Sequence, residues 1–87
     1  MFVILCYDVK ESRCEAVRKT ACKYLRAAQE SVFEGFLSDN QVSALKRELL
    51  SKIDPDEDSI ILYKYVPGCY FTKDEVGVRR ITDPRFL

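Results

Sequence analysis

Asp8 is the first residue that could carry chemistry, because it ends the apolar run of residues 2–7. A charge at the end of a buried strand is costly unless it is paired, hydrogen-bonded or bound to a metal ion. One interpretation, which the residue alone favours, is that Asp8 accepts backbone N–H bonds at the positive end of a following helix. The other is metal binding, since Mg²⁺ prefers oxygen ligands and is often held by one or two carboxylates.

The usage of histidine and cysteine excludes several other reactions. The chain has no histidine, which removes the usual general base near neutral pH and the commonest metal ligand. Nucleophilic schemes built on Ser–His or Cys–His pairs are therefore excluded. The four cysteines contain no Cys-x-x-Cys pair, which argues against a zinc knuckle or a thioredoxin-type redox pair. We interpret the cysteines as small buried side chains in a reducing compartment.

The length of 87 residues and the 47% hydrophobic content indicate one globular domain, 1–87, with a thin core. No apolar run approaches the roughly 18 residues of a membrane-spanning helix, and residues 1–5 lack the basic lead of a signal peptide. We therefore expect a soluble, cytoplasmic protein without a membrane partner.

Charge is segregated along the chain although the net charge is zero. Residues 10–26 contain six basic and two acidic residues, whereas residues 30–58 contain eight acidic and three basic ones. Such asymmetry can create a basic surface that attracts phosphate groups. Ordinary solvated helix faces explain the same pattern equally well.

The hydrophobic pattern predicts alternating strands and helices. Residues 2–7 are apolar on both parities, as in a strand that is buried on both sides. Ser12 and Glu15 have the spacing of a capping box, which predicts a helix that continues to about Arg26. Residues 28–37 are β-like, with Gly35 marking a bulge or a close backbone approach, but the pattern does not separate one bent strand from two.

A second capping box, Ser38 and Gln41, predicts another helix that ends near Lys52. An acidic turn over 54–58 leads to a third clear strand at 59–66, which is again apolar on both parities. A last short strand is predicted around 76–81. This order predicts a ferredoxin-like α+β sandwich, βαββαβ with an extra C-terminal strand, with two helices on one face of an antiparallel sheet.

The same pattern predicts a homodimer. Two helices cover only one face of such a sheet, and an exposed apolar sheet face normally marks an association surface. A two-fold axis near Asp8 would bring two copies of this carboxylate together around one Mg²⁺ ion. That ion could lower the pKa of a coordinated water and so supply the nucleophile that a chain without histidine lacks.

Several segments resemble the Cas-two family, the second of the two core CRISPR-associated proteins. The resemblance covers residues 1–66 in order and rests on Tyr7-Asp8-Val9, Arg13, Tyr24-Leu25, the run from Gln29 to Gly35, and Asp58-Ser59-Ile60. It implies a ferredoxin-like subunit that dimerises through its sheets, with residues 67–87 as a tail that packs on the partner. It also implies metal-dependent endonuclease activity on RNA or DNA. In spacer acquisition such a dimer bridges the CRISPR integrase subunits and holds the incoming DNA.

The resemblance implies roles for individual residues. The catalytic group would be Asp8, Tyr7, Arg13 and Phe33, in which the two Asp8 side chains of a dimer share one Mg²⁺ and Arg13 offsets developing charge. Tyr7 and Phe33 have core packing as an equal alternative. Candidate phosphate contacts, each of which could equally be a solvated charge, are Lys19, Lys23 and Arg26 on an outer helix ridge, with Arg79 and Arg80 near the last strand. The family often has an arginine at the position of Ala27, which weakens any inference about substrate contacts there.

Two other functions stay open at this point. The chain could be a scaffold of the same family that bridges DNA without catalysis, its Asp8 pair being structural or vestigial. It could also be a toxin-type ribonuclease, because a virulence-associated toxin family shares this small fold and dimer.

Overall fold

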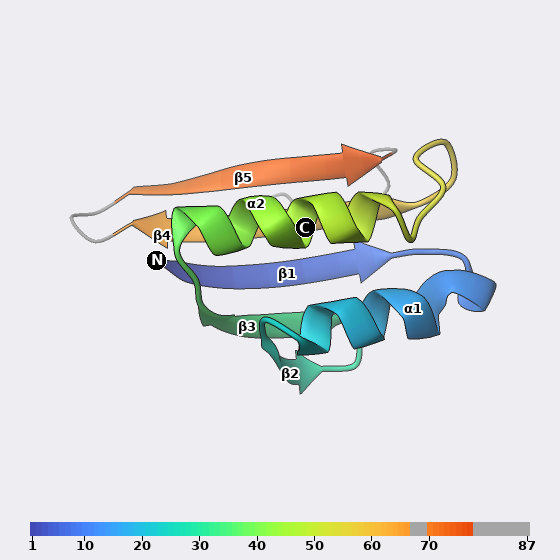
Figure 1. The fold of residues 1–87 in the computed structure, drawn as a ribbon, viewed down its shortest axis with the longest axis horizontal. Helices are drawn as coiled ribbons and strands as arrows, with labels where there is room; N and C mark the ends of the chain where they lie inside the picture. Colours follow the sequence, from blue (N-terminus) through green and yellow to red (C-terminus); the bar gives the residue numbers. More distant parts are fainter. Residues whose placement is uncertain (67–69, 78–87) are drawn as a thin grey trace, which may run out of the picture.

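The computed structural model describes residues 1–66 and 70–77. In this part of the chain a five-stranded antiparallel sheet has the strand order β2-β3-β1-β4-β5, and both helices lie on one side of it (Figure 1). This arrangement confirms the predicted α+β class. The elements are β1 (Phe2–Asp8), α1 (Glu11–Cys22), β2 (Arg26–Gln29), β3 (Val32–Phe36), α2 (Asp39–Leu50), β4 (Ser59–Val66) and β5 (Tyr70–Gly77).

The core lies between the sheet and the two helices. Side chains alternate across a strand, so β1 turns Val3, Leu5 and Tyr7 toward the helices, where all three are buried. Phe2, Ile4 and Cys6 are only half-buried on the other side of the strand. We call that side the helix-free face. The sequence pattern predicted a strand that is buried on both faces. Within a single chain, the helices bury only one face of β1.

The boundaries predicted for the first helix were wrong at both ends. α1 begins after Lys10, and no side-chain capping bond forms at its start, so the Ser12–Glu15 capping box is not used. Instead, the carboxylate of Asp58 accepts a hydrogen bond from the backbone N–H of Lys10 at 2.9 Å. The helix ends at Cys22, and Arg26 is already the first residue of β2. A distant acidic side chain thus replaces the local cap.

The second helix follows its predicted start closely. The Ser38 hydroxyl accepts a bond from the Gln41 backbone N–H at 3.2 Å, and the Gln41 side chain accepts one from the Ser38 N–H at 2.9 Å. Leu45 and Leu49 are fully buried. The helix ends at Leu50 rather than Lys52. Of the two helix starts, the one built on local capping was thus predictable.

Residues 28–37 form two strands rather than one bent strand. β2 and β3 pair as a hairpin, and the irregularity in their register lies between Ala27 and Gln29 rather than at Gly35. Gly35 marks a close approach instead, since a Cβ there would lie 3.1 Å from Cδ2 of Leu25.

The last strand differs from its predicted position. β5 begins at Tyr70 and pairs with β4 of the same chain along its whole length, from Val66↔Tyr70 to Ser59↔Gly77. Asp74 of this strand accepts bonds from Lys46 of α2 at 2.8 Å and from Lys64 of β4 at 2.6 Å. The remainder of the predicted strand, 78–81, lies outside the described residues, so packing of the 67–87 tail on a partner stays a prediction. Neither described helix has the length and apolar character needed to cross a membrane.

Candidate active site at the end of β1

Asp8 is exposed and is the last residue of β1. By strand alternation it lies on the helix-free face, on the same side as Phe2, Ile4 and Cys6. In the register of the sheet it is opposite Ser59 of β4, which in turn is opposite Gly77 of β5. The carboxylate is therefore displayed at one end of the face that the helices leave uncovered.

The structure does not support the helix-capping interpretation of Asp8. Within residues 1–66 and 70–77, the acidic side chain that receives the backbone N–H at the start of α1 is Asp58. The Asp8 carboxylate accepts no hydrogen bond and forms no ion pair with any other described residue. It is thus an exposed oxygen ligand without a partner in this part of the chain.

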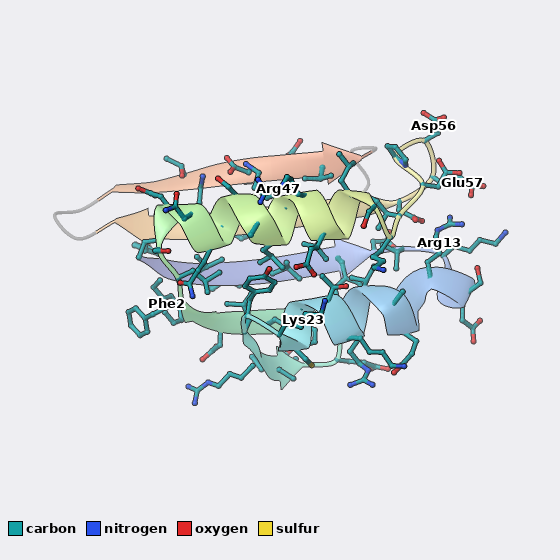
Figure 2. All side chains as sticks on the ribbon, in the orientation of Figure 1. Phe2, Arg13, Lys23, Arg47, Asp56 and Glu57 are labelled. Carbon is teal, nitrogen blue, oxygen red and sulfur yellow. The ribbon has the colours of Figure 1, made fainter. Side chains whose placement is uncertain are left out.

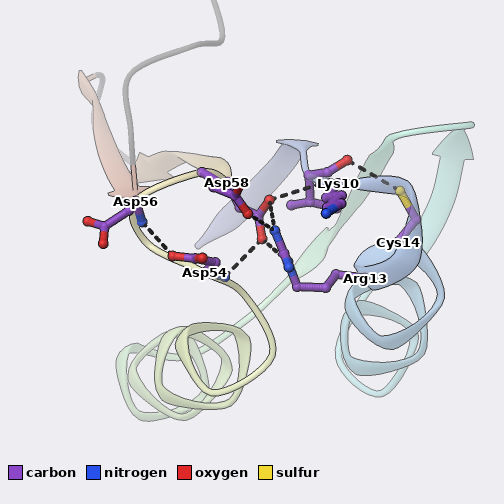
Figure 3. Close-up of polar contacts among 8 residues, drawn as sticks. Lys10, Arg13, Cys14, Asp54, Asp56 and Asp58 are labelled. Atoms are coloured by element: carbon purple, nitrogen blue, oxygen red, sulfur yellow. Dashed lines mark hydrogen bonds and ion pairs between the residues drawn. The ribbon is translucent and has the colours of Figure 1, made fainter.

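Arg13 and Asp58 form a two-point charged contact, and Asp58 directly precedes Ser59, the residue opposite Asp8 in the sheet. Arg13 Nε lies 2.5 Å from Oδ2 of Asp58, and Nη2 lies 3.0 Å from Oδ1 (Figure 3). The same Nη2 also donates to Glu57 at 3.0 Å. Asp58 is fully buried. The Arg13 guanidinium is the main cause that holds the pKa of the Asp58 carboxyl below its usual range, and the bonds to Asp58 and Glu57 raise the pKa of Arg13.

Backbone N–H groups also donate hydrogen bonds to the Asp58 carboxylate. Its oxygens also accept the N–H of Lys10 and the N–H of Asp54, each at 2.9 Å (Figure 3). Asp58 therefore connects the residues just after Asp8, the first turn of α1 and the loop before β4. The family resemblance included Asp58 but assigned no role to it. Its position directly before a buried strand, the same reasoning as for Asp8, is the signal that could have singled it out.

Tyr7 and Phe33 lie on the opposite side of the sheet from Asp8. Their rings stack at a centroid distance of 6.2 Å, and their exposed fractions are 7% and 1%. Burial raises the pKa of Tyr7. The structure therefore places both residues in the core, in agreement with their packing alternative, and does not bring them together with Asp8.

The predicted basic ridge is not continuous. Lys23 follows α1 and pairs with Glu48 of α2 at 2.9 Å, whereas Arg26 lies on β2 and contacts Glu34 at 3.4 Å. Figure 2 shows the region of Lys23, at the end of α1, far from the end of the helix that carries Arg13. Lys19 is exposed on α1. Arg79 and Arg80 lie outside the described residues.

The helix-free face carries an apolar surface. Phe2 is opposite both Phe36 and Tyr65 in the register, and the rings of Phe2 and Phe36 meet edge to face at 5.1 Å. Phe36 is 79% exposed and Tyr65 is 52% exposed. This aromatic group occupies the end of the face opposite to Asp8, and Cys6 and Ile61 lie between the two ends. Burial raises the pKa of the Cys6 thiol.

At the end of β1 the chain offers the exposed carboxylate of Asp8 to a metal ion. No group of three or more potential metal ligands occurs among the described residues. Asp8 has the hard oxygen chemistry that Mg²⁺ prefers. A stable site at this position would need ligands from a second copy of the chain.

Comparison with known proteins gives consistent matches over most of the chain. The family model described as "CRISPR associated protein Cas2" matches residues 1–73. A Thermotoga maritima protein named "CRISPR-associated endoribonuclease Cas2" is 40% identical over 83 residues, which are 95% of each chain. A protein of the same name from Dictyoglomus turgidum is 38% identical over 92% of each chain. The crystal structure of Streptococcus pyogenes Cas2 at pH 6.5 superposes with a TM-score of 0.70 at 30% identity, covering 78% of this chain and 89% of that one.

Proposed function

The chain belongs to the CRISPR associated protein Cas2 family, and from this premise we propose that it is a metal-dependent endonuclease. It would cleave RNA or DNA phosphodiesters as a homodimer in the cytoplasm. The observation that carries the proposal is the exposed carboxylate of Asp8 at one end of an apolar sheet face, which has no hydrogen-bond or ion-pair partner within residues 1–66 and 70–77. Relatives that are named endoribonucleases support the nuclease part.

The helix-free face is the proposed dimer interface. It exposes large apolar side chains such as Phe36, and burial of apolar surface is the main driving force of protein association. Asp8 lies on this same face. A two-fold axis that passes near the end of β1 brings two Asp8 carboxylates toward each other, which is unfavourable unless a cation lies between them.

A shared Mg²⁺ ion fits this chemistry. Two carboxylates are a sufficient protein contribution for Mg²⁺, which usually keeps several waters. When bound, the ion would supply a Lewis acid that polarises a phosphodiester oxygen. The chain's own contribution is to hold the Asp8 oxygens at the end of a rigid strand.

Arg13 is a positioning residue in this proposal. Its Nε and Nη2 groups are bonded to Asp58 and Glu57, so these donors do not reach toward Asp8. Through Asp58 it holds the backbone of Lys10, two residues after Asp8. Tyr7 and Phe33 support β1 from the helix-facing side of the sheet, because their stacked rings fill the core there.

A cleavage assay tests the proposal. Wild type and Asp8→Asn are incubated with labelled single-stranded RNA and duplex DNA, with Mg²⁺ or with EDTA. We expect cleavage by the wild type with Mg²⁺ only, and its loss in Asp8→Asn. Asp56→Asn is the matched control, because it removes another exposed carboxylate, from the loop before β4. Equal cleavage by Asp8→Asn and wild type would contradict the proposal.

A non-catalytic scaffold is the second candidate. It is favoured by one observation: of the four residues expected to act together, Tyr7 and Phe33 are core residues and Arg13 is engaged by acids. In this case the dimer would bridge CRISPR integrase subunits and bound DNA. Two results together would establish the scaffold. The wild type would cleave neither RNA nor DNA, and Asp8→Asn would form a complex with the integrase subunit as well as the wild type does.

A further inference from the structure

A solvent-open hollow of about 490 Å³ lies along α1 on the helix side of the sheet, away from the helix-free face. One wall is α1, and the other includes the segment just after α2. Figure 1 shows α1 and the end of α2 side by side in front of the sheet. The lining residues are Ser12, Glu15, Ala16, Lys19, Thr20, Lys23 and Lys52. We call this hollow the lysine groove.

The lysine groove carries an excess of positive charge, because three lysines and one glutamate are among its described lining residues. The acidic residue among the described lining, Glu15, is paired with Arg18, and Lys23 is paired with Glu48. Lys19 and Lys52 are both exposed and form no ion pair with any residue in the part of the chain that the structure describes. Two lysine charges that line one hollow raise the local positive potential, which attracts anions.

Contacts at both ends hold the walls of the groove in place. At the Ser12 end, Arg13 of α1 is bonded to Asp58, which follows Lys52 in the loop before β4. At the other end, Lys23 and the hydroxyl of Tyr24 both donate to Glu48 of α2, at 2.9 and 2.7 Å. The groove is therefore formed before any ligand binds, which reduces the entropy lost on binding.

The lining chemistry selects phosphate rather than a nucleobase. None of the described residues that line the groove has an aromatic side chain on which a base could stack, and stacking is the usual way of holding unpaired bases. Ammonium groups bind phosphate as point charges and read no sequence. The Ser12 end of the groove follows the end of β1 by four residues, while Asp8 itself lies on the opposite, helix-free face of the sheet.

We propose that the lysine groove binds the phosphate backbone of a nucleic-acid strand, with Lys19 and Lys52 as its two contacts. This inference rests on the proposed function, because it gives the nucleic acid a place on the chain. The lysine groove takes the place of the basic ridge that the sequence predicted. Lys19 belongs to both, and Lys52 is a new contact. Lys23 is paired with Glu48, and Arg26 lies on β2.

Fluorescence anisotropy with labelled oligonucleotides of mixed sequence tests the groove. Wild type, Lys19→Gln, Lys52→Gln and the double variant are titrated in EDTA, so that no metal-dependent cleavage interferes. Counterion release predicts that each lost phosphate contact weakens binding roughly fivefold to tenfold at 0.1 M salt. It also lowers the slope of log K against log salt by about 0.9 on duplex DNA. Arg47→Gln is the matched control, since Arg47 is exposed on α2 and does not line the groove.

The result that overturns the inference is equal affinity of the double variant and the wild type, at an unchanged melting temperature. A second arm separates nucleic acid from small anions, by recording amide shifts of the groove residues with inorganic phosphate. Shifts with phosphate alone, without any loss of oligonucleotide binding in the double variant, would also overturn it. The proposed nuclease fails in a different measurement, namely absence of Mg²⁺-dependent cleavage, so the two failures are distinguishable.

Discussion

Arg13 on α1 and Asp58 before β4 form a two-point contact although they are 45 residues apart in the chain. Nε and Nη2 of the guanidinium meet the two carboxylate oxygens at 2.5 and 3.0 Å. Planar contacts of this type are among the stronger hydrogen-bonded pairs in proteins. Because Asp58 also receives the N–H groups of Lys10 and Asp54, this pair fixes the backbone next to Asp8.

We expect Asp58→Ala to lower the free energy of unfolding by roughly 3 kcal/mol, because it leaves two backbone N–H groups without their acceptor and leaves Arg13 with Glu57 as its acidic partner. Urea denaturation followed by circular dichroism measures the change. The control is Asp56→Ala, which removes an exposed carboxylate from the same loop. Equal stability of the two variants would show that the Asp58 network contributes little.

Acid should destabilise the protein through the same residue. The pKa of Asp58 in the folded chain lies below its ordinary value of 3.8, so in acid the unfolded chain binds the proton more tightly. The stabilisation is therefore complete above that ordinary value and is lost as the pH falls below it. Urea unfolding from pH 6 to pH 3 should show a steeper loss for wild type than for Asp58→Asn. Parallel pH profiles would contradict this assignment.

Elements that depend on local signals could be predicted from the sequence. The Ser38–Gln41 capping box and the strand 59–66 were correct because neighbouring residues determine them. The start of α1 could not be found in this way, since its cap is the side chain of Asp58 from a distant loop. β5 was misplaced for a similar reason, because its position is set by pairing with β4 rather than by its own weak pattern.

The candidate site was predictable to a smaller extent. The pattern of β1 identified Asp8 as an exception in an apolar run, and the structure leaves this carboxylate exposed. For Tyr7 and Phe33 the sequence allowed both a catalytic and a packing role, and only the stacked geometry places them in the core. The partner of Arg13 could not be read from spacing, because ion pairs between distant segments follow from the completed fold.

Gly77 should tolerate substitution much less than Gly35. Gly77 has a φ of 86°, and a Cβ at this position would overlap the carbonyl oxygen of Asp58. We expect Gly77→Ala to cost roughly 2 kcal/mol of stability, because the strained backbone and the overlap with a main-chain atom cannot both be relieved. At Gly35 the closest contact of a Cβ is the end of the Leu25 side chain, at 3.1 Å, which can rotate away, and the nearest backbone atom is at an ordinary 3.7 Å. Thermal unfolding of the two alanine variants compares them, and a Gly77→Ala protein as stable as Gly35→Ala would contradict the geometry.

The helix-free face gives the sharpest test of dimerisation. Phe36 is 79% exposed on this face and contacts Phe2, whereas Leu50 is 50% exposed on α2, on the helix side. If two copies associate through their sheets, Phe36→Asp buries a charge in the interface and should weaken the dimer about tenfold or more. Leu50→Asp should leave the dimer intact. Light scattering after size exclusion at micromolar concentration would then give twice the 10.1 kDa chain mass for wild type and Leu50→Asp, and a lower mass for Phe36→Asp. The opposite pattern would place the interface on the helix side, and the two Asp8 carboxylates could not share an ion.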